Sequence, residues 1–339
     1  MAKATQPRAG EKPAKTGSEN GTGEDQLRFF RAAHYSTGEL ARIRTFLRPN
    51  GTSLILPYDQ FIEHDSRHLA AESDAGNPDY ICELAIDGGY NAIVFHYGLS
   101  MRYWAKIEGR VPIIVKVNGK TSIPSGKLPL STHTGWIEDA VRIGAVGIGY
   151  TLYYGSPRQD EDLPQLAHVR QECEKYGLPL IVWAYPRGEA VEAKGGQDCS
   201  YMIESGVRMA VEMGASIVKA NFPKKNEKLH EIKDVPQYFK DLEQHLLKMS
   251  DDDQFAERSR RVVDAGQGIP ILFSGGEETK DDEVIRRMKQ GVEVGCLGYI
   301  FGRNMWKRAK PAALDLTKKA QDLLDQSPGP HRRARSERF

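Results

Sequence analysis

Residues Pro179-Leu-Ile-Val-Trp-Ala-Tyr185 form a short apolar run, and a helix-like stretch over Tyr201–Met213 leads from it to a second run, Ser216-Ile-Val-Lys219. Neither run alternates polar with apolar residues, which is expected of parallel strands that are covered on both faces. Two parallel strands joined by a helix are the repeating unit of α/β folds. This stretch therefore predicts a parallel sheet flanked by helices.

The same alternation continues in both directions along the chain. Further strands are predicted at Ser53–Asp59, Ala92–Phe95, Pro112–Asn118, Val146–Thr151, Ile269–Phe273 and Gly298–Phe301. Further helices are predicted at Asp79–Asp87, Trp136–Ile143, Leu163–Tyr176, Val235–Lys248, Asp281–Lys289 and Met305–Leu324. Eight strands, most of them followed by a helix, over about 250 residues have the size and pattern of a single-domain TIM (β/α)8 barrel.

A doubly wound Rossmann sheet shares this alternation and is the competing fold. Such a sheet would carry a G-x-G-x-x-G turn after its first strand. No such turn opens the first unit here, and Gly144, Gly147 and Gly149 have the wrong spacing within the fourth strand region. The strand count therefore favours the barrel.

The charge balance excludes several classes of protein. The 339-residue chain has 47 Lys and Arg against 46 Asp and Glu, a formal net charge of +1. So small an excess provides no general attraction to nucleic acid or to an anionic membrane. No run approaches the roughly 18–20 apolar residues of a membrane span. The four cysteines form no C-x-x-C pair, so we expect reduced thiols in a cytoplasmic protein.

Two polar segments flank the predicted barrel. Residues 1–26 lack aromatic residues and the apolar centre of a secretion signal, so we expect a disordered N-terminal tail. Residues 326–339 contain four arginines and are predicted to be a basic, disordered tail. The barrel and its N-terminal extension would then occupy residues 27–325.

Chemistry in a TIM barrel belongs to residues at or just beyond the C-terminal ends of the strands. These positions carry acids, amines, a phenol and glycine-containing loops: Asp59, Lys116, Asn118, Tyr185, Arg187, Lys219, Ser274-Gly275-Gly276 and Gly302-Arg303. In a barrel, all of them would meet at one rim.

Lys219 is the most informative of these residues. Desolvation in a buried strand, or a nearby cation, lowers the pKa of a lysine. The resulting neutral amine can attack a carbonyl carbon and form a Schiff base. The alternative is a structural lysine paired with an adjacent carboxylate.

The two glycine-containing loops predict a phosphate site. Glycines let backbone N–H groups approach a phosphate, Arg303 adds positive charge, and barrels commonly bind phosphate on the loops after strands 7 and 8. The alternative is a pair of ordinary turns.

Tyr185 could move a proton and Arg187 could bind a second phosphate. Alternatively, Tyr185 packs and Arg187 pairs with Glu189.

Two other motifs are incomplete. The segment Asn118-Gly-Lys-Thr121 resembles the end of a P-loop, but that motif requires a glycine at the position of Ile114. His64 and His68 are four residues apart, but the neighbouring Glu63 precedes the first histidine, so the order is not that of H-E-x-x-H zinc sites. We therefore expect no metal.

Six motifs, in order along the chain, resemble the archaeal/bacterial-type class I fructose-bisphosphate aldolases, which are metal-independent Schiff-base enzymes. The motifs are Tyr58-Asp-Gln-Phe-Ile-Glu-His64, Val115-Lys-Val-Asn-Gly-Lys-Thr121, Trp183-Ala-Tyr-Pro-Arg187, Ile217-Val-Lys219, Ser274-Gly-Gly276 and Ile300-Phe-Gly-Arg303. The likeness runs from about Leu47 to Arg308. It implies a TIM barrel that binds a phosphorylated sugar, needs no cofactor and forms a homo-oligomer, often a decamer.

The resemblance also implies a role for each matching position. Lys219 matches the Schiff-base lysine, Tyr185 the proton donor, and Asp59 the acidic residue after the first strand. Trp183 and Arg187 match substrate contacts, and the phosphate loops match Ser274, Gly275, Gly276, Gly302 and Arg303. We add Lys116 as a substrate contact because of its position at the end of the third predicted strand.

The first loop departs from the family pattern. Phe61 stands where the family commonly has the glycine of Asp-Gln-Gly or Asp-His-Gly, and Asp65-Ser66 replaces the Gly-Pro that often follows Glu-His. A bulky residue restricts the backbone, so these changes bear on the preferred sugar phosphate more than on the chemistry. Two alternatives therefore stay open: the same chemistry on another phosphorylated ketose, and a sugar-phosphate-binding protein without turnover.

Overall fold

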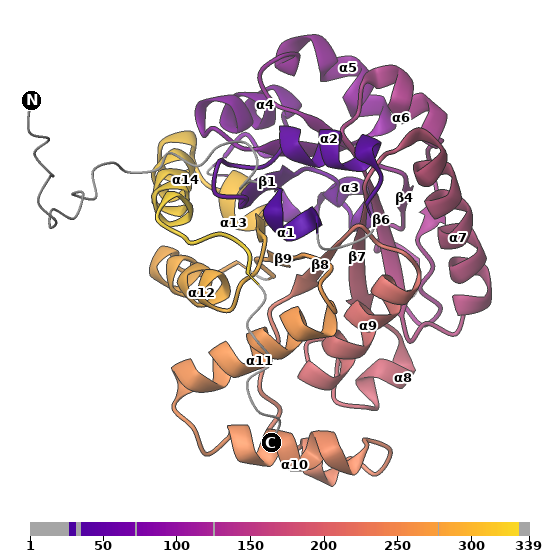
Figure 1. Cartoon of the computed structure of the whole chain (residues 1–339), viewed down its shortest axis with the longest axis vertical. Coiled ribbons are helices and arrows are strands. Elements are labelled where there is room, and N and C mark those ends of the chain that lie inside the picture. The colour runs from indigo at the N-terminus through magenta and orange to yellow at the C-terminus, as the bar shows by residue number, and fades with distance from the viewer. Residues whose placement is uncertain (1–26, 32–34, 72, 125, 277, 332–339) are drawn as a thin grey trace, which may run out of the picture.

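The barrel expected from the sequence is present in the computed structural model, which describes residues 27–31, 35–71, 73–124, 126–276 and 278–331. Eight parallel strands close in the order β1-β10-β9-β8-β7-β6-β3-β2 (Figure 1). The strands are β1 (Ser53–Pro57), β2 (Ala92–His96), β3 (Ile113–Lys116), β6 (Gly147–Tyr154), β7 (Leu180–Pro186), β8 (Ile217–Asn221), β9 (Ile271–Ser274) and β10 (Gly298–Ile300). The predicted single-domain TIM barrel is confirmed.

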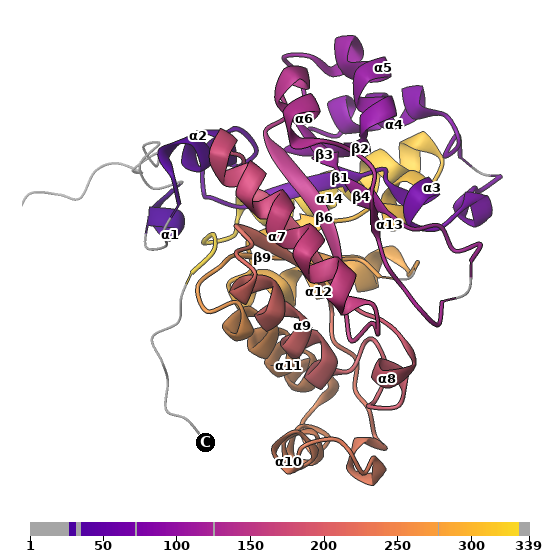
Figure 2. The same ribbon diagram turned by 90° about the vertical axis from the view of Figure 1, so that its right-hand side faces the viewer.

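Helices surround the strands. The main ones are α4 (Pro78–Asp87), α5 (Tyr97–Ile107), α6 (Ile137–Ile143), α7 (Gln159–Tyr176), α9 (Ser200–Glu212), α11 (Asp251–Ala265), α12 (Asp281–Glu293) and α14 (Lys310–Asp325). Additional short elements are α3 (Gln60–Glu63), η1 (Ser66–His68), α8 (Glu189–Glu192), η2 (Leu229–Glu231), α10 (Gln237–Leu246) and α13 (Arg303–Trp306). The helix α10 lies outside α9 and α11, away from the barrel (Figure 2).

Alternate residues of each strand face two different apolar clusters. In β1, Ile55 belongs to the cluster inside the barrel, whereas Leu54 and Leu56 belong to the cluster beneath the surrounding helices. In β7, Ile181 and Val182 divide in the same way. Burial on both sides explains why the strand sequences lack polar alternation. It also fixes Trp183 and Lys219 on the interior side, since each lies two residues beyond an inward-facing isoleucine.

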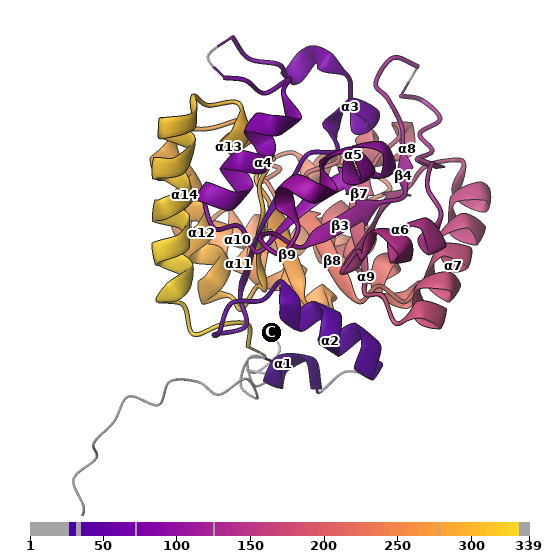
Figure 3. The ribbon, with the colours of Figure 1, turned by 90° about the horizontal axis from the view of Figure 1, so that it is seen from above.

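Two N-terminal helices cover one end of the barrel. They are α1 (Arg28–Arg31) and α2 (Thr37–Thr45), and a capping box between Ser36 and Glu39 begins the second. Phe30 and Phe46 are fully buried in the interior cluster. Figure 3 shows α1 and α2 at the end opposite α3 and α8. The barrel is therefore closed at this end and open only at the other.

The structure differs from the sequence prediction in several segments. The predicted strand Pro112–Asn118 ends at Lys116, and Asn118–Gly119 forms a separate strand, β4, paired antiparallel with β5 (Thr132–His133). The predicted helix Met305–Leu324 is divided into α13 and α14 because Pro311 lies in the first turn of α14. The helices α2, α5 and α11 are not among those predicted.

The predicted tails fall largely outside the described residues. This holds for all of 1–26 and for 332–339. Near the C-terminus, however, Ser327 and Gly329 are buried, and the Asn50 side-chain amide donates to the Ser327 carbonyl at 2.9 Å. The first residues of the predicted basic tail therefore pack against the loop before β1.

Candidate active site

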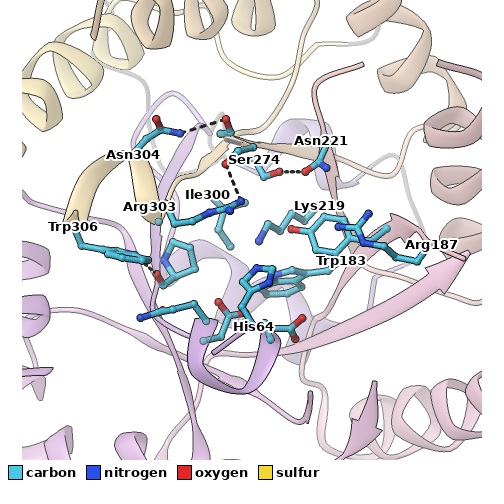
Figure 4. A pocket seen from close by; sticks show the side chains of 18 residues that line it. His64, Trp183, Arg187, Lys219, Asn221, Ser274, Ile300, Arg303, Asn304 and Trp306 are labelled. Carbon is cyan, nitrogen blue, oxygen red and sulfur yellow. Dashed lines mark hydrogen bonds between the residues drawn. The ribbon is translucent and has the colours of Figure 1, made fainter. Parts of the chain in front are cut away.

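A pocket opens at the C-terminal ends of the strands, with an empty volume of about 670 Å³ including its mouth. It is lined by Pro57, Asp59, Gln60, Glu63, His64, Trp183, Tyr185, Arg187, Lys219, Asn221, Ser274, Gly275, Gly276, Ile300, Gly302, Arg303, Asn304 and Trp306 (Figure 4). The structure thus brings together every site residue predicted from the sequence except Lys116.

Lys219 extends into this pocket from β8. Its Nζ lies 4.8 Å from the centre of the Trp183 ring and 5.5 Å from that of Tyr185, so two aromatic rings form its immediate walls. Burial lowers the pKa of Lys219 to about 8, against the opposing charges of Asp59 and Glu63. About a tenth of the amine is therefore unprotonated, and nucleophilic, at pH 7, far more than for a lysine with the ordinary pKa.

Asp59 lies two residues after the end of β1 and is the N-cap residue of α3. Burial alone would raise the pKa of its carboxyl, but the positive charges of Lys116 and Lys219 outweigh this and leave the pKa below its usual value. One carboxylate oxygen, Oδ2, has no hydrogen bond to any described residue; the Lys116 Nζ is 3.9 Å away. Asp59 is therefore an ionised acceptor at the pocket wall.

Lys116 lies below the pocket rather than in its lining. The side chain is fully buried, its Nζ contacts Glu63 Oε1, and it donates to the Asn118 carbonyl at 3.1 Å. The structure does not bring Lys116 together with the other predicted substrate contacts, because its side chain is fully buried outside the pocket lining. The strand-end rule locates the residue correctly, but its amine is held by a buried partner on α3.

Tyr185 and Arg187 follow each other on the inward side at the end of β7. Burial, reinforced by Asp59 and Glu63, raises the pKa of the Tyr185 phenol well above its usual value, so the phenol remains a proton donor. The Arg187 guanidinium lies 5.1 Å from the Tyr185 ring centre and donates to the Pro186 carbonyl at 2.7 Å. The alternative pairing of Arg187 with Glu189 does not occur; Glu189 pairs with Lys127 at 3.5 Å.

The two glycine loops meet at the opposite wall. Arg303 begins α13 and donates to the Gly276 carbonyl at 2.9 Å, so the loops after β9 and β10 are joined. A Cβ on Gly275 would come within 2.6 Å of Asn304 Nδ2, which shows how closely the backbone is packed here. Ser274 donates its hydroxyl hydrogen to Asn221 Oδ1. The arrangement presents glycine backbone and a guanidinium to the same space.

Several lining residues were missed as site residues in the sequence. His64 points into the pocket (Figure 4), and burial together with Arg303 lowers its pKa to about 4, so it is neutral at pH 7. Trp306 donates its indole N–H to the Pro57 carbonyl at 3.1 Å. Asn221 follows Lys219 by two residues, so the same inward register could have identified it. In the sequence, Glu63 and His64 are part of an incomplete zinc motif and of the first family motif, but neither is assigned a role.

Phe61, the departure from the family pattern, does not line the pocket. Its side chain is 37% exposed on α3, and its ring packs edge-on against Tyr58 with centres 5.9 Å apart. The backbone at this position is helical. The phenylalanine therefore adds no bulk to the pocket itself.

Metal and membrane sites were also sought. Within the described residues, no group of three or more His, Cys, Asp and Glu side chains is arranged to hold a metal ion. None of the helices in the described part of the chain is both long and apolar enough to cross a membrane. All four cysteines are buried free thiols.

Comparison with known proteins identifies the family. The sequence pattern of the DeoC/LacD family of aldolases matches residues 53–308, which is the whole barrel from β1 to the end of α13 and two residues beyond. The chain belongs to the DeoC/LacD aldolase family. The family resemblance inferred from the sequence motifs is confirmed.

Among its relatives is a class 1 fructose-bisphosphate aldolase of Thermoproteus tenax, 34% identical over 267 residues, covering 78% of this chain and 87% of that protein. A second, from Methanocaldococcus jannaschii, is named a fructose-bisphosphate aldolase/6-deoxy-5-ketofructose 1-phosphate synthase; it is 26% identical and covers 78% of both chains. A solved archaeal fructose-1,6-bisphosphate aldolase, with its catalytic lysine covalently bound to a carbinolamine intermediate, has a TM-score of 0.68 and 29% identity, covering 84% of this chain and 98% of that one.

Proposed function

We propose that this chain is a class I fructose-bisphosphate aldolase, which reversibly cleaves fructose 1,6-bisphosphate into dihydroxyacetone phosphate and glyceraldehyde 3-phosphate. The observation that carries the proposal is Lys219, an amine with a pKa of about 8 inside a pocket that also holds Tyr185 and Arg303. The names of the relative in Thermoproteus tenax and of the archaeal solved structure support the same activity.

The first half of the reaction forms the Schiff base. The unprotonated Nζ of Lys219 adds to the C2 carbonyl carbon, and the former carbonyl oxygen takes a proton from the Tyr185 phenol. The Tyr185 phenolate takes a proton from the adduct nitrogen and passes it to the new hydroxyl, which leaves as water. The product is an iminium ion, in which nitrogen carries the positive charge, beside a Tyr185 phenolate. The raised pKa of Tyr185 suits this role, because the phenol keeps its proton until the oxygen of the carbinolamine requires it.

The second half breaks the C3–C4 bond. Its electron pair moves toward the iminium nitrogen and gives an enamine, while the C4 hydroxyl loses its proton and becomes the aldehyde of glyceraldehyde 3-phosphate. We assign Asp59 to orient this hydroxyl or accept its proton, since one of its carboxylate oxygens has no hydrogen bond to a described residue. The Asp59 carboxyl returns its proton to the Tyr185 phenolate, and the restored phenol protonates the enamine at C3. Addition of water to the resulting iminium ion releases dihydroxyacetone phosphate and neutral Lys219, and the proton set free in this hydrolysis restores the Tyr185 phenol.

Substrate binding is assigned to the two walls of the pocket. One phosphate would be bound by Ser274, Gly275, Gly276, Gly302 and Arg303, and Arg187 is the candidate for the other. Trp183 would donate its indole N–H, which is buried and has no hydrogen-bond partner among the described residues. Contacts to both phosphates would position the reacting carbons for attack by Lys219.

Borohydride trapping tests the proposal most directly. Enzyme treated with dihydroxyacetone phosphate and borohydride should gain a stable adduct on the peptide that contains Lys219, and cleavage of fructose 1,6-bisphosphate should persist in EDTA. An unmodified Lys219 peptide at saturating ligand would favour a binding protein without turnover. Loss of cleavage on chelation would instead indicate a metal-dependent enzyme.

The alternative is the same chemistry on another phosphorylated ketose. The Methanocaldococcus jannaschii relative is also named a 6-deoxy-5-ketofructose 1-phosphate synthase, and this second activity supports the alternative. Product analysis with several ketose phosphates separates the two. Triose phosphates formed from fructose 1,6-bisphosphate support the proposal. Cleavage of a different ketose phosphate alone would show that fructose 1,6-bisphosphate is not the substrate.

The cellular setting is part of the same proposal. We place the enzyme in the cytoplasm, in glycolysis and gluconeogenesis, as a homo-oligomer that could be a decamer, with no cofactor, nucleic-acid partner or membrane contact. The four buried free thiols are compatible with a reducing compartment. Light scattering during size-exclusion chromatography measures the number of subunits directly.

A further inference from the structure

Lys116 is a fully buried cation that the mechanism above does not use. Its Nζ contacts Glu63 Oε1, lies 3.9 Å from Asp59 Oδ2 and donates to the Asn118 carbonyl. Glu63 accepts a further hydrogen bond from the Thr151 hydroxyl at 3.0 Å. Lys116 and Glu63 therefore form a hydrogen-bonded ion pair directly beneath the pocket.

The chain leaves space for this pair at one particular glycine. Gly149 on β6 is the register partner of Lys116 on β3. A Cβ at Gly149 would lie 2.9 Å from Lys116 Cδ and 2.6 Å from the edge of the Trp183 ring. With glycine there, the Lys116 Nζ lies 5.3 Å from the centre of the same indole that Lys219 approaches to 4.8 Å. The two lysines are therefore neighbours across one aromatic side chain.

The charges near Lys219 indicate how the buried pair affects the protonation of its amine. Asp59 and Glu63 are two acids beside one pocket amine, and both act to keep Lys219 protonated. In a buried site such carboxylates stabilise the ammonium form strongly. Lys116 supplies a second cation within reach of both acids, so that their charge is not balanced by Lys219 alone.

We propose that the Lys116–Glu63 pair is a positioning element that balances the charge of the acids beneath Lys219, so that the Lys219 amine can lose its proton near neutral pH. The proposal deepens the aldolase function and rests on it for its purpose. The proposed effect is on the pH at which the Lys219 amine loses its proton, and this pH can be measured without any sugar phosphate.

The other ionisable groups facing the site do not supply the same balance. Burial lowers the pKa of both His64 and His96, and His64, with a pKa of about 4, is neutral at pH 7. Arg303 lies on the far wall, held by the Gly276 carbonyl, and its positive charge also lowers the pKa of Lys219. Glu63 also acts electrostatically on Tyr153 and Tyr185, and Asp59 acts on Tyr185, whereas Arg187 acts on these two phenols. Lys116 is the cation in direct contact with Glu63.

The test changes the charge of the pair in both directions. Lys116→Met removes the cation, so the pH midpoint for deprotonation of Lys219 should rise by about one unit. Glu63→Gln removes an acid and leaves Lys116, so the midpoint should fall by about one unit. The double variant restores the balance and should return it close to the wild-type value.

The measurement is the reaction of Lys219 with trinitrobenzenesulfonate as a function of pH, followed by peptide mapping of the full chain. The same variants are then trapped with dihydroxyacetone phosphate and borohydride, and the acid limb of trapping should move with the midpoint. If the midpoints shift but no adduct with dihydroxyacetone phosphate forms, the electrostatic proposal stands and the aldolase function fails.

A second buried ion pair provides the matched control. Arg258 and Glu243 are 2.7 Å apart and about as buried, but they join α11 to α10 away from the pocket. Arg258→Met and Glu243→Gln should lower the melting temperature without moving the Lys219 midpoint. Equal midpoints in wild type, Lys116→Met and Glu63→Gln, or shifts of the same sign in both, would overturn the proposal. Should Lys116→Met not fold, an unchanged or raised midpoint in Glu63→Gln overturns it alone.

Discussion

The two ends of this barrel use the same strands for opposite purposes. Toward the N-terminal end, inward-facing residues such as Ile55, Ile181 and Ile217 pack with Phe46 of the covering helices into one apolar cluster. Two residues further along β8, the same inward register carries Lys219. One end therefore contributes burial of apolar surface, while the other holds charged groups that are costly to bury.

This difference separates stability from chemistry along the barrel axis. The closed end can be packed without regard to substrate, because α1 and α2 cover it. The open end must keep an amine of lowered pKa, an ionised acid and a protonated phenol side by side, and it does so through burial and mutual charge. Substitutions at the two ends should then affect different measured quantities, and four predictions test this separation.

Lys219→Met should have the largest effect. We expect loss of borohydride trapping at this position and a fall in kcat/KM of at least about 10⁴-fold, since the nucleophile is removed. The free energy of unfolding at pH 7 should not fall. Because burial lowers the pKa from its ordinary value of 10.5 to about 8 in the folded protein, the folded state binds fewer protons between these values, and burial of the lysine costs stability that is recovered only as pH rises through this window.

The same variant decides whether Lys219 is structural. A loss of more than about 2 kcal/mol in chemical denaturation would show a stabilising ion pair, because breaking a buried pair leaves an uncompensated charge. The charge-retaining Lys219→Arg is the companion variant, because a guanidinium cannot act as the nucleophile at neutral pH. It too should give no trapped adduct.

Tyr185→Phe should rank second. Removing the phenolic proton donor should lower kcat by about 10²–10⁴-fold with little change in KM, since general acid catalysis typically contributes that much. Lys219 should still react with trinitrobenzenesulfonate, which shows that the amine is intact. If instead only KM rises, Tyr185 is a binding residue, and the proton donor must be sought elsewhere in the pocket.

Arg303→Met should have a smaller effect of a different kind. Loss of one charge-assisted contact costs about 1.5–3 kcal/mol, which corresponds to roughly 10- to 150-fold in kcat/KM. We expect most of it in KM for fructose 1,6-bisphosphate. Steady-state kinetics with a phosphate-free ketose as the comparison substrate separates the two contributions. An equal loss on both substrates would count against a phosphate contact at this position.

The residues of the open end could be predicted well from the sequence. The rule that barrel chemistry lies at the C-terminal ends of the strands requires only that each strand be recognised in the sequence. Once the runs before Lys219 and Tyr185 are interpreted as parallel strands, the position of each residue at the rim follows. The pairing of Lys116 with Glu63 could not be found in this way, because the two lie 53 positions apart and meet only when β1 and β3 are placed on either side of β2. The position of Lys116 at a strand end therefore groups it with the substrate contacts, although its amine is buried against Glu63.

The missed helices have a physical explanation of the same kind. In α11 the buried residues are Gln254, Arg258, Ser259 and Val262, so most of its inner face is polar and the apolar period is hidden. In α5 the inner face is marked by Ser100 and Ile107, while Met101 and Trp104 are exposed. Periodicity predicts helices whose inner face is apolar. In α5 and α11, the residues on the inner face are instead chosen to suit neighbouring elements that are distant in sequence.

Phe46→Ala should have the smallest effect on catalysis and a large one on stability. The phenylalanine is fully buried in the interior cluster at the end of α2, so its removal leaves a cavity and should lower the free energy of unfolding by about 3–5 kcal/mol. At a temperature where the variant remains folded, kcat and KM should stay within about twofold of wild type. A markedly raised KM would mean that packing at the closed end is transmitted along the strands to the pocket, and the two ends would then not be separable.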